Sequence, residues 1–150
     1  MSLSPALVPA GQGRLVRAFG EELQFHLTGA ETGGAYAQWV ETTPPGGGPP
    51  PHYHTGEDEW FYVLEGTVSF FKDGAWSEVG PGAGAYLPRN SVHTFKNTGE
   101  TPLRMVVTVA PAGFETFMTR CEEVWNQPGA PDMERILQIS AEHGIHFVAP

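Results

Sequence analysis

The chain has 150 residues, with 8 Lys or Arg against 17 Asp or Glu, so its formal net charge is −9. This length fits one domain with its own core, and no apolar stretch approaches the roughly 18 residues that a membrane span requires. The acidic balance argues against nucleic acid and membranes as partners, because anionic surfaces attract basic patches. The single Cys121 excludes an internal disulfide, and the N-terminus lacks the features of a secretory signal, so we expect a cytoplasmic protein.

Short alternating apolar runs, separated by Gly and Pro, occupy most of the chain. This pattern is typical of strands joined by tight turns. Residues 6–27 predict two short strands, at 6–8 and 22–27, and residues 34–42 predict a third. After the Pro- and Gly-rich segment 44–51, six further runs follow up to Ala110, and their regular spacing indicates an all-β sandwich or barrel.

The period of the pattern changes near residue 113. Apolar residues then recur at helical spacing from Phe114 to Trp125, and a second amphipathic helix begins near Pro131 and ends before Gly144. We therefore expect a β-barrel with N-terminal strands over residues 1–112. A helical tail over residues 113–150 is expected to pack on the same domain.

His52 and His54 are two residues apart, so in an extended segment both imidazoles project to one side, about 6.6 Å apart along the strand. Such a pair can supply two ligands to one metal ion, although a His-x-His pair by itself is more often incidental. Glu59 shares a strand face with Phe61 and Val63, where an unpaired carboxylate would be costly to bury. The alternative is a solvated acidic turn, in which we place Glu57 and Asp58.

His93 shares a face with Phe95 and Asn97, on a side of its strand that is expected to face inward. A histidine in this setting, taken alone, is more often a hydrogen-bonded core residue than a metal ligand. The spacing of these polar residues along the chain carries more information than any one of them.

Two spaced motifs resemble those of the cupin superfamily. Fixed positions of the first motif are filled by Gly46, His52, His54, Glu59 and Gly66. Those of the second are filled by Gly82, Pro88, His93 and Asn97, with Asn90 where the family usually has Gly. Asn tolerates a turn with positive φ better than most residues, so this departure affects turn geometry and not the site. The segments HYHTGEDEWFYVLEG and PAGFETF are similar to the bacterial quercetin 2,3-dioxygenase-like group of monocupins.

The resemblance implies an all-β, antiparallel jelly-roll barrel with two short C-terminal helices and a metal in its mouth. His52, His54, Glu59 and His93 carry over as ligands of one divalent transition metal ion, and this ligand set suits Fe, Ni, Mn, Co, Cu or Zn. Two positions of an octahedral site would remain open for water or substrate. The resemblance further implies a dioxygenase in which Glu59 is both a ligand and the catalytic base.

The predicted strands carry apolar residues at their inward-facing positions, and these residues predict an apolar pocket. Its wall is predicted to contain Phe61, Val63, Phe95, Met105 and Val107, without inward Lys or Arg. This favours a planar aromatic or enol substrate over a sugar phosphate. Two alternatives stay open: a non-catalytic cupin that binds a small molecule, and a Zn- or Mn-dependent isomerase or hydrolase. Outward Trp60 and Tyr62, with exposed sheet edges, predict a homodimer.

Overall fold

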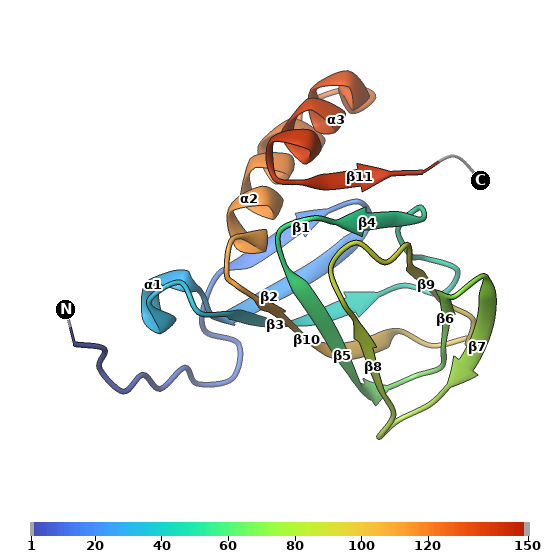
Figure 1. Ribbon diagram of the computed structural model, residues 1–150, viewed down its shortest axis with the longest axis horizontal. Helices are drawn as coiled ribbons and strands as arrows, with labels where there is room; N and C mark the ends of the chain where they lie inside the picture. Colours follow the sequence, from blue (N-terminus) through green and yellow to red (C-terminus); the bar gives the residue numbers. More distant parts are fainter. Residues whose placement is uncertain (1, 149–150) are drawn as a thin grey trace.

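Two antiparallel β layers and a helical tail make up the computed structural model, which describes residues 2–148 (Figure 1). The first layer is a six-stranded sheet in the order β1-β2-β3-β10-β5-β8. Its strands are β1 (Leu15–Ala18), β2 (Glu21–Leu27), β3 (Ala37–Thr43), β10 (Leu103–Ala110), β5 (Asp58–Glu65) and β8 (Gly84–Leu87). A short helix, α1 (Gly29–Thr32), connects β2 to β3.

The second layer contains two smaller sheets. One has the order β7-β6-β9, from β7 (Ala75–Val79), β6 (Val68–Lys72) and β9 (Thr94–Asn97). The other pairs β4 (His52–His54) with β11 (Ile145–Phe147). A single antiparallel bridge between His52 and His93 links these two sheets, and the described residues form no ladder that closes a barrel. The expected all-β jelly roll is confirmed as an open sandwich.

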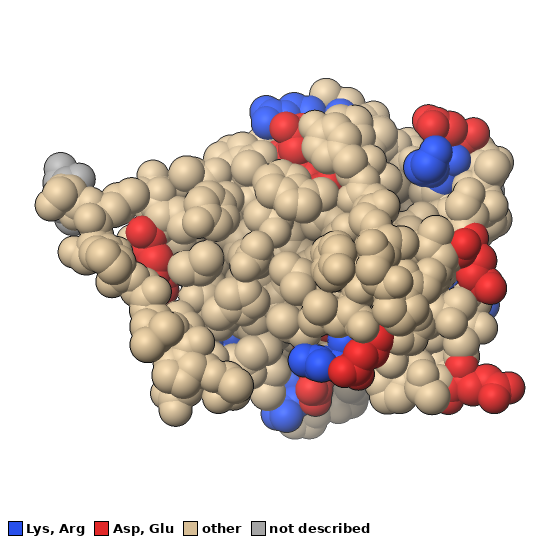
Figure 2. Space-filling view, turned by 90° about the horizontal axis from the view of Figure 1, so that it is seen from below, with Lys and Arg blue, Asp and Glu red and all other residues tan. Residues whose placement is uncertain are grey.

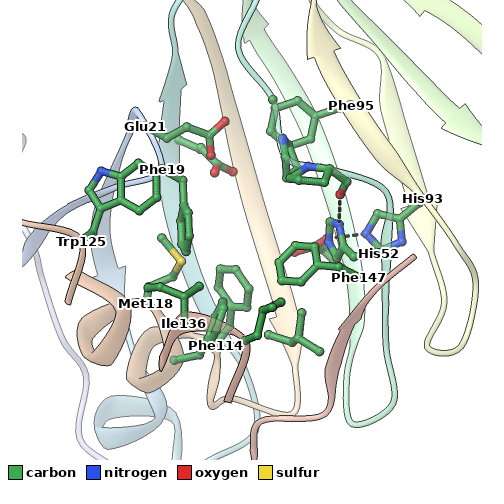
Figure 3. A pocket seen from close by; sticks show the side chains of 18 of the residues that line it. Phe19, Glu21, His52, His93, Phe95, Phe114, Met118, Trp125, Ile136 and Phe147 are labelled. Atoms are coloured by element: carbon green, nitrogen blue, oxygen red, sulfur yellow. Dashed lines mark hydrogen bonds and ion pairs between the residues drawn. The ribbon is translucent and has the colours of Figure 1, made fainter. Parts of the chain in front are cut away.

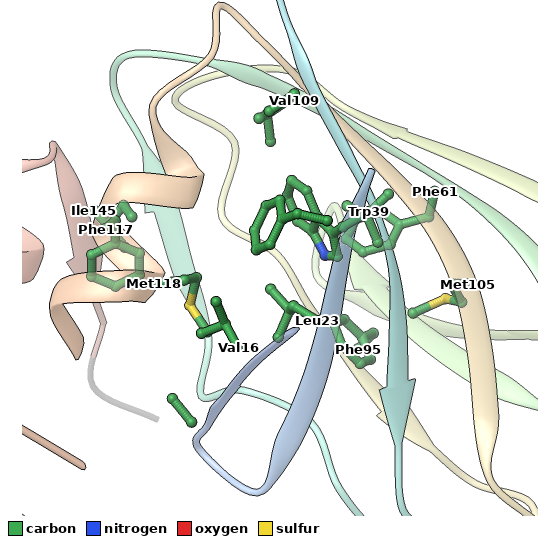
Figure 4. Close-up of a cluster of buried hydrophobic side chains, with 14 of the residues drawn as sticks. Val16, Leu23, Trp39, Phe61, Phe95, Met105, Val109, Phe117, Met118 and Ile145 are labelled. Carbon is green, nitrogen blue, oxygen red and sulfur yellow. The ribbon is translucent and has the colours of Figure 1, made fainter. Parts of the chain in front are cut away.

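The core lies between the layers, where alternate residues of each strand project inward (Figure 4). Along β3 every second residue from Ala37 to Thr43 is buried, as the period of two requires. Phe61 of the first layer lies 5.4 Å from Phe70 and 5.6 Å from Phe95 of the second, measured between ring centroids. These aromatic contacts hold the two layers together.

The C-terminal segment forms the two predicted helices, α2 (Phe114–Trp125) and α3 (Met133–Glu142), and then returns to the sheets as β11. Asp132 caps α3 by accepting a hydrogen bond from the Arg135 amide. The helices lie at one end of the sandwich, with α2 beside β1 and α3 beside β11 (Figure 1). They pack on the same hydrophobic core through Phe117, Met118 and Ile136.

Two details differ from the sequence predictions. Residues 6–8 are not a strand, because the N-terminal segment runs exposed along the surface and the first strand begins at Leu15. The helix α1 was not expected, since its four residues are too short to show helical periodicity. The ends of the predicted ranges 1–112 and 113–150, at residues 1, 149 and 150, lie outside the described residues. Among residues 2–148, no helix is both long and apolar enough to cross a membrane.

Candidate metal centre and its cavity

The two histidine-bearing segments are fastened to each other by backbone hydrogen bonds. The His52 amide donates to the His93 carbonyl at 3.0 Å, and the His93 amide donates back to the His52 carbonyl at 2.9 Å. The Asn90 amide donates to the His54 carbonyl at 2.7 Å. Asn90 has a φ of 69°, the left-handed conformation expected for this turn. The geometry of the centre is therefore set by main-chain pairing.

This pairing brings three imidazoles together from two distant parts of the chain. The ligand atoms of His52, His54 and His93 all lie within 4.8 Å of one another. Each ring is buried, and ring centroids are 4.6 Å apart for His52 and His93 and 5.0 Å for His52 and His54. The His-x-His spacing on β4 thus places both rings on one face, as predicted from its period.

Every one of the three Nδ1 atoms faces a hydrogen-bond acceptor. His52 Nδ1 donates to the Pro50 carbonyl at 2.9 Å, and His93 Nδ1 donates to the Ser91 carbonyl at 3.0 Å. His54 Nδ1 donates to Glu57 Oε1 at 2.6 Å. A carbonyl oxygen only accepts, so Nδ1 carries the proton and the Nε2 lone pairs are left for another partner. This orientation by outer groups is typical of metal-binding histidines.

Glu59 joins the cluster through His93. Its Oε1 lies 3.2 Å from His93 Nε2, and its side chain is almost fully buried. On β5, Glu59 is paired with Val109 and Leu87, so the ladders on both sides fix its inward direction. The preceding residue, Asp58, faces outward and binds the Arg89 guanidinium through both carboxylate oxygens, at 3.1 and 3.2 Å.

Burial and neighbouring charges shift the pKa values of the cluster in different directions. Burial, with the nearby His93 and His54, lowers the pKa of His52 to about 4. For His54, burial lowers the pKa, but the Glu57 hydrogen bond and the Glu59 charge outweigh it and leave the pKa raised. Burial raises the pKa of Glu59, but the His93 hydrogen bond and the histidine charges leave it lowered. An ionised Glu59 and a neutral His52 are both suited to bind a cation.

These residues fit a divalent metal ion on two grounds. His54 Nε2 is buried and has no hydrogen-bond partner among the described residues, which is costly unless a ligand satisfies it. At His93, an Nε2 lone pair faces the Glu59 carboxylate, so a proton or a cation is required between two electron-rich atoms. Two ligand atoms about 2.1 Å from one ion, at right angles, are about 3 Å apart, which is close to the 3.2 Å between His93 Nε2 and Glu59 Oε1.

A cavity of about 410 Å³ opens beside the centre. His52, Glu59 and His93 form part of its wall, whereas His54 is buried and does not. Figure 3 shows His52 and His93 next to each other on one side of the pocket. The tail provides much of the remaining wall through Phe114, Phe117, Met118, Trp125, Met133, Ile136, Leu137, Ile145 and Phe147. The C-terminal segment therefore covers the cavity as well as packing on the sandwich, which sequence alone did not determine.

The structure brings some of the predicted pocket residues to the cavity and others to the core. Phe61 and Phe95 line the cavity. Val63, Met105 and Val107 are fully buried on inward faces, as predicted, but they pack in the core and do not line this cavity. The reason is that the inward face of each strand runs from the closed core to the open end of the sandwich, so only the inward residues near the open end reach the cavity.

Sequence reasoning was wrong about Glu57 and overlooked two other carboxyl groups. Glu57 is not part of a solvated turn: its side chain is 12% exposed and accepts the His54 hydrogen bond. Glu21 and Glu41 also line the cavity. Their signal was present as alternation, because Glu21 precedes inward Leu23 by two residues and Glu41 follows inward Trp39 by two.

Comparison with known proteins agrees with this geometry. The sequence model of the cupin domain family matches residues 39–109, from β3 to β10, and this range includes all four candidate ligands. Quercetin 2,3-dioxygenase of Bacillus subtilis is 28% identical in an alignment of 113 residues that covers 71% of this chain and 33% of that protein. The chain thus spans about a third of the length of this curated relative.

Solved structures show the same architecture. The polyketide cyclase RemF from Streptomyces resistomycificus has a TM-score of 0.62 and 25% identity, covering 71% of this chain and 80% of that one. An RmlC-like cupin from Shewanella frigidimarina has a TM-score of 0.64 and 18% identity, covering 77% and 99% of the two chains. The second likeness concerns the fold alone. A polyketide cyclase and an RmlC-like cupin therefore resemble the fold of this chain to a similar degree.

Proposed function

We propose, from the premise that this chain carries a cupin domain, that it is a metal-dependent dioxygenase of planar aromatic or enol substrates, with quercetinase-like activity. The observation that carries this proposal is the position of the histidine cluster and Glu59 at one side of an apolar, aromatic cavity. The similarity to quercetin 2,3-dioxygenase supports the reaction type. Fold by itself does not, because one fold supports many chemistries.

In this proposal His52, His54, His93 and Glu59 hold one divalent transition metal ion, which is Fe, Ni, Mn, Co, Cu or Zn. When bound, such an ion supplies Lewis-acid chemistry and, for the redox-active metals, electron transfer to oxygen. The chain's own contribution is orientation. The hydrogen bonds from each Nδ1 fix the rings, and the backbone bridge between His52 and His93 fixes their separation.

Glu59 is proposed as the group that takes the proton of the substrate. Its carboxylate is the ionised form, because the histidines around it lower its pKa against the effect of burial. It borders the cavity, so a substrate hydroxyl bound there can donate its proton to Glu59 directly. Removing that proton leaves an electron-rich enolate, the form in which such a substrate is oxidised.

The rest of the cavity would select the substrate. Aromatic rings of Phe61, Phe95, Phe114 and Trp39 form flat apolar surfaces, and a volume of about 410 Å³ is suited to a small molecule of a few fused rings. The described residues that line the cavity include no Lys or Arg. An anionic substrate such as a sugar phosphate would therefore lack a cationic partner.

Oxygen uptake tests this function. Protein reconstituted separately with each candidate metal would be supplied with a series of flavonols and related enols. We expect oxygen uptake with at least one metal, and we expect its rate to fall by about 100-fold or more in Glu59→Gln. The rate should not fall in Glu65→Gln, which changes an exposed carboxylate on the same strand. If no metal and no substrate of these classes support oxygen consumption, the dioxygenase proposal is wrong.

A second candidate is a metal-dependent enzyme without a redox step, acting on an aromatic polyketide. It is favoured by the 25% identity to the polyketide cyclase RemF over 71% of this chain. The same cavity and the same four ligands would serve it. If the protein purifies with Zn, consumes no oxygen and converts a polyketide, the non-redox enzyme is supported. If it binds aromatic ligands but converts none of them, it is a binding protein.

We also propose a homodimer formed through the outer face of the six-stranded sheet. Trp60, Tyr62 and Tyr86 project outward from β5 and β8 and are exposed. Seen from below, the molecule has a broad central area with few charged side chains (Figure 2). Exposed aromatic residues of this kind are enriched in protein interfaces.

A further inference from the structure

The cavity contains a second polar group besides the metal centre, formed by Glu21 and Glu41. Glu21 begins β2 and Glu41 lies on the neighbouring β3, and both side chains face inward and are less than 10% exposed. No cation compensates them, since the ion pairs of the described residues include neither carboxyl. In Figure 3, Glu21 lies on the opposite side of the cavity from His93.

The two carboxyl groups are close neighbours, since each shifts the pKa of the other. Two buried carboxyl groups side by side are not both ionised, because their like charges repel where little water screens them. The Thr43 hydroxyl donates to Glu21 Oε1 at 3.1 Å, which stabilises the ionised form of Glu21, so we assign the proton of the pair to Glu41. Burial and the charge of Glu21 raise the pKa of Glu41 well above its ordinary value, in agreement with this assignment.

A donor without a partner lies beside the pair. Trp39, on the same strand as Glu41, lines the cavity, and its indole Nε1 has no hydrogen-bond partner among the described residues. The indole lies close to the Glu41 carboxyl and lowers its pKa, but no hydrogen bond of ordinary geometry joins the two groups. A buried indole N–H that is left unpaired costs free energy, and a ligand oxygen at this wall would satisfy it.

We infer that Glu21, Glu41 and Trp39 form a binding site for a hydroxyl group of the ligand, remote from the oxygen that binds at the histidines. A hydroxyl suits all three residues, because its hydrogen donates to the carboxyl pair and its oxygen accepts from Trp39. A carboxylate would be repelled by the acidic pair, and an ammonium group cannot accept from the indole. The inference rests on the proposed function for an aromatic occupant, and it narrows the substrate to aromatic rings that carry hydroxyl groups at two separated positions.

Binding of three probes of similar shape to metal-free protein tests this site without any reaction. The probes are naphthalene, 2-naphthol and 2-naphthoate, followed by fluorescence titration. We expect 2-naphthol to bind about tenfold more tightly than naphthalene, as a hydrogen bond to a charged group provides, and 2-naphthoate to bind most weakly. The preference for 2-naphthol should persist in His52→Ala, because it does not depend on the histidines.

Glu21→Met/Glu41→Met is the decisive variant. Methionine is similar in length to glutamate and apolar, so the cavity is kept and naphthalene should bind as before, while the tenfold preference for 2-naphthol disappears. Glu41→Gln, which can still donate to Glu21, should retain the preference. The inference is overturned if neither probe binds, if the double variant keeps the preference, or if His52→Ala removes it. Because no metal or oxygen is present, these results are independent of the dioxygenase assay.

Discussion

At the scale of single residues, hydrogen bonds made by the outer ring nitrogens orient the imidazoles of the candidate metal centre. Pro50, Ser91 and Glu57 each accept from one Nδ1, so each Nε2 is held in place as the proposed ligand atom. Two of these acceptors are backbone carbonyls that no side-chain substitution can remove. Glu57 is the exception, and its carboxylate adds negative charge beside the centre.

Glu57→Gln is therefore expected to weaken metal binding by about 10- to 100-fold, because the charged acceptor that orients His54 becomes a neutral one. Asp58→Asn is the matched control, since Asp58 is the next residue along the chain but binds Arg89 and no histidine. Competition with a chelating dye measures both affinities. Equal affinities in the two variants would contradict the role given to Glu57.

Glu41 predicts a dependence of stability on pH. Its pKa is raised on folding, so between the unfolded value near 4.5 and the higher folded value the native state holds a proton that the unfolded state has lost. Stability then falls as pH rises, by up to about 1.4 kcal/mol per pH unit for each such proton.

Glu41→Gln removes this titration, so the variant should be more stable than the wild type at pH 7, and the difference should shrink toward pH 4.5. Chemical denaturation at both pH values measures it. Glu123→Gln, at an exposed position of α2, should change stability by less than about 0.5 kcal/mol at either pH. A Glu41→Gln variant that loses stability at pH 7 would show that the buried pair is stabilising.

At the scale of elements, the tail and the sandwich form one structural unit around the cavity. β11 pairs with β4, and α2 and α3 contribute Phe117 and Ile136 to the cavity wall. The Thr55 amide donates to the Gly144 carbonyl at 2.9 Å, which joins the end of α3 to the turn after His54. The helices therefore stabilise the fold and shape the site together.

Two neighbouring residues of α3 test this packing. Ile136 is fully buried whereas Leu137 is 52% exposed. Ile136→Ala should lower the free energy of unfolding by about 2–5 kcal/mol, because it opens a void in the core, and Leu137→Ala should lower it by less than about 1 kcal/mol. Denaturant titration of the two variants compares them. Similar losses would mean that α3 is not packed on the core as described.

Sequence was most informative where pattern and period coincide. The motif spacing predicted His52, His54, Glu59 and His93 as ligands, and the structure brings these four side chains together. Helical periodicity predicted α2 and α3, which the structure contains. Sequence reasoning failed where the three-dimensional arrangement of the chain decides which side chains meet. Glu57 lies in an acidic turn that has the composition of a solvated one, but the turn between β4 and β5 folds its carboxylate back onto His54, three residues earlier. Glu21 and Glu41 are adjacent only because β2 pairs with β3.

At the scale of the whole molecule, the exposed aromatic face of β5 and β8 is the feature that a monomer does not explain. Tyr62→Glu/Tyr86→Glu should convert the proposed dimer to a monomer, since two charges would be buried at the interface. Trp76→Glu is the control, because Trp76 is equally exposed but lies on β7 in the other layer. Sedimentation velocity measures the mass. A wild-type monomer would contradict the proposal.

The central claim is that the histidine cluster and Glu59 hold a metal ion, and elemental analysis of the purified protein tests it most directly. The wild type and the His52→Ala/His54→Ala variant would be compared, each as purified and after incubation with the candidate metals. We predict about one divalent transition metal ion per chain in the wild type and none retained by the variant. A folded wild-type protein that retains no metal after incubation, or a variant that retains as much as the wild type, would contradict the claim.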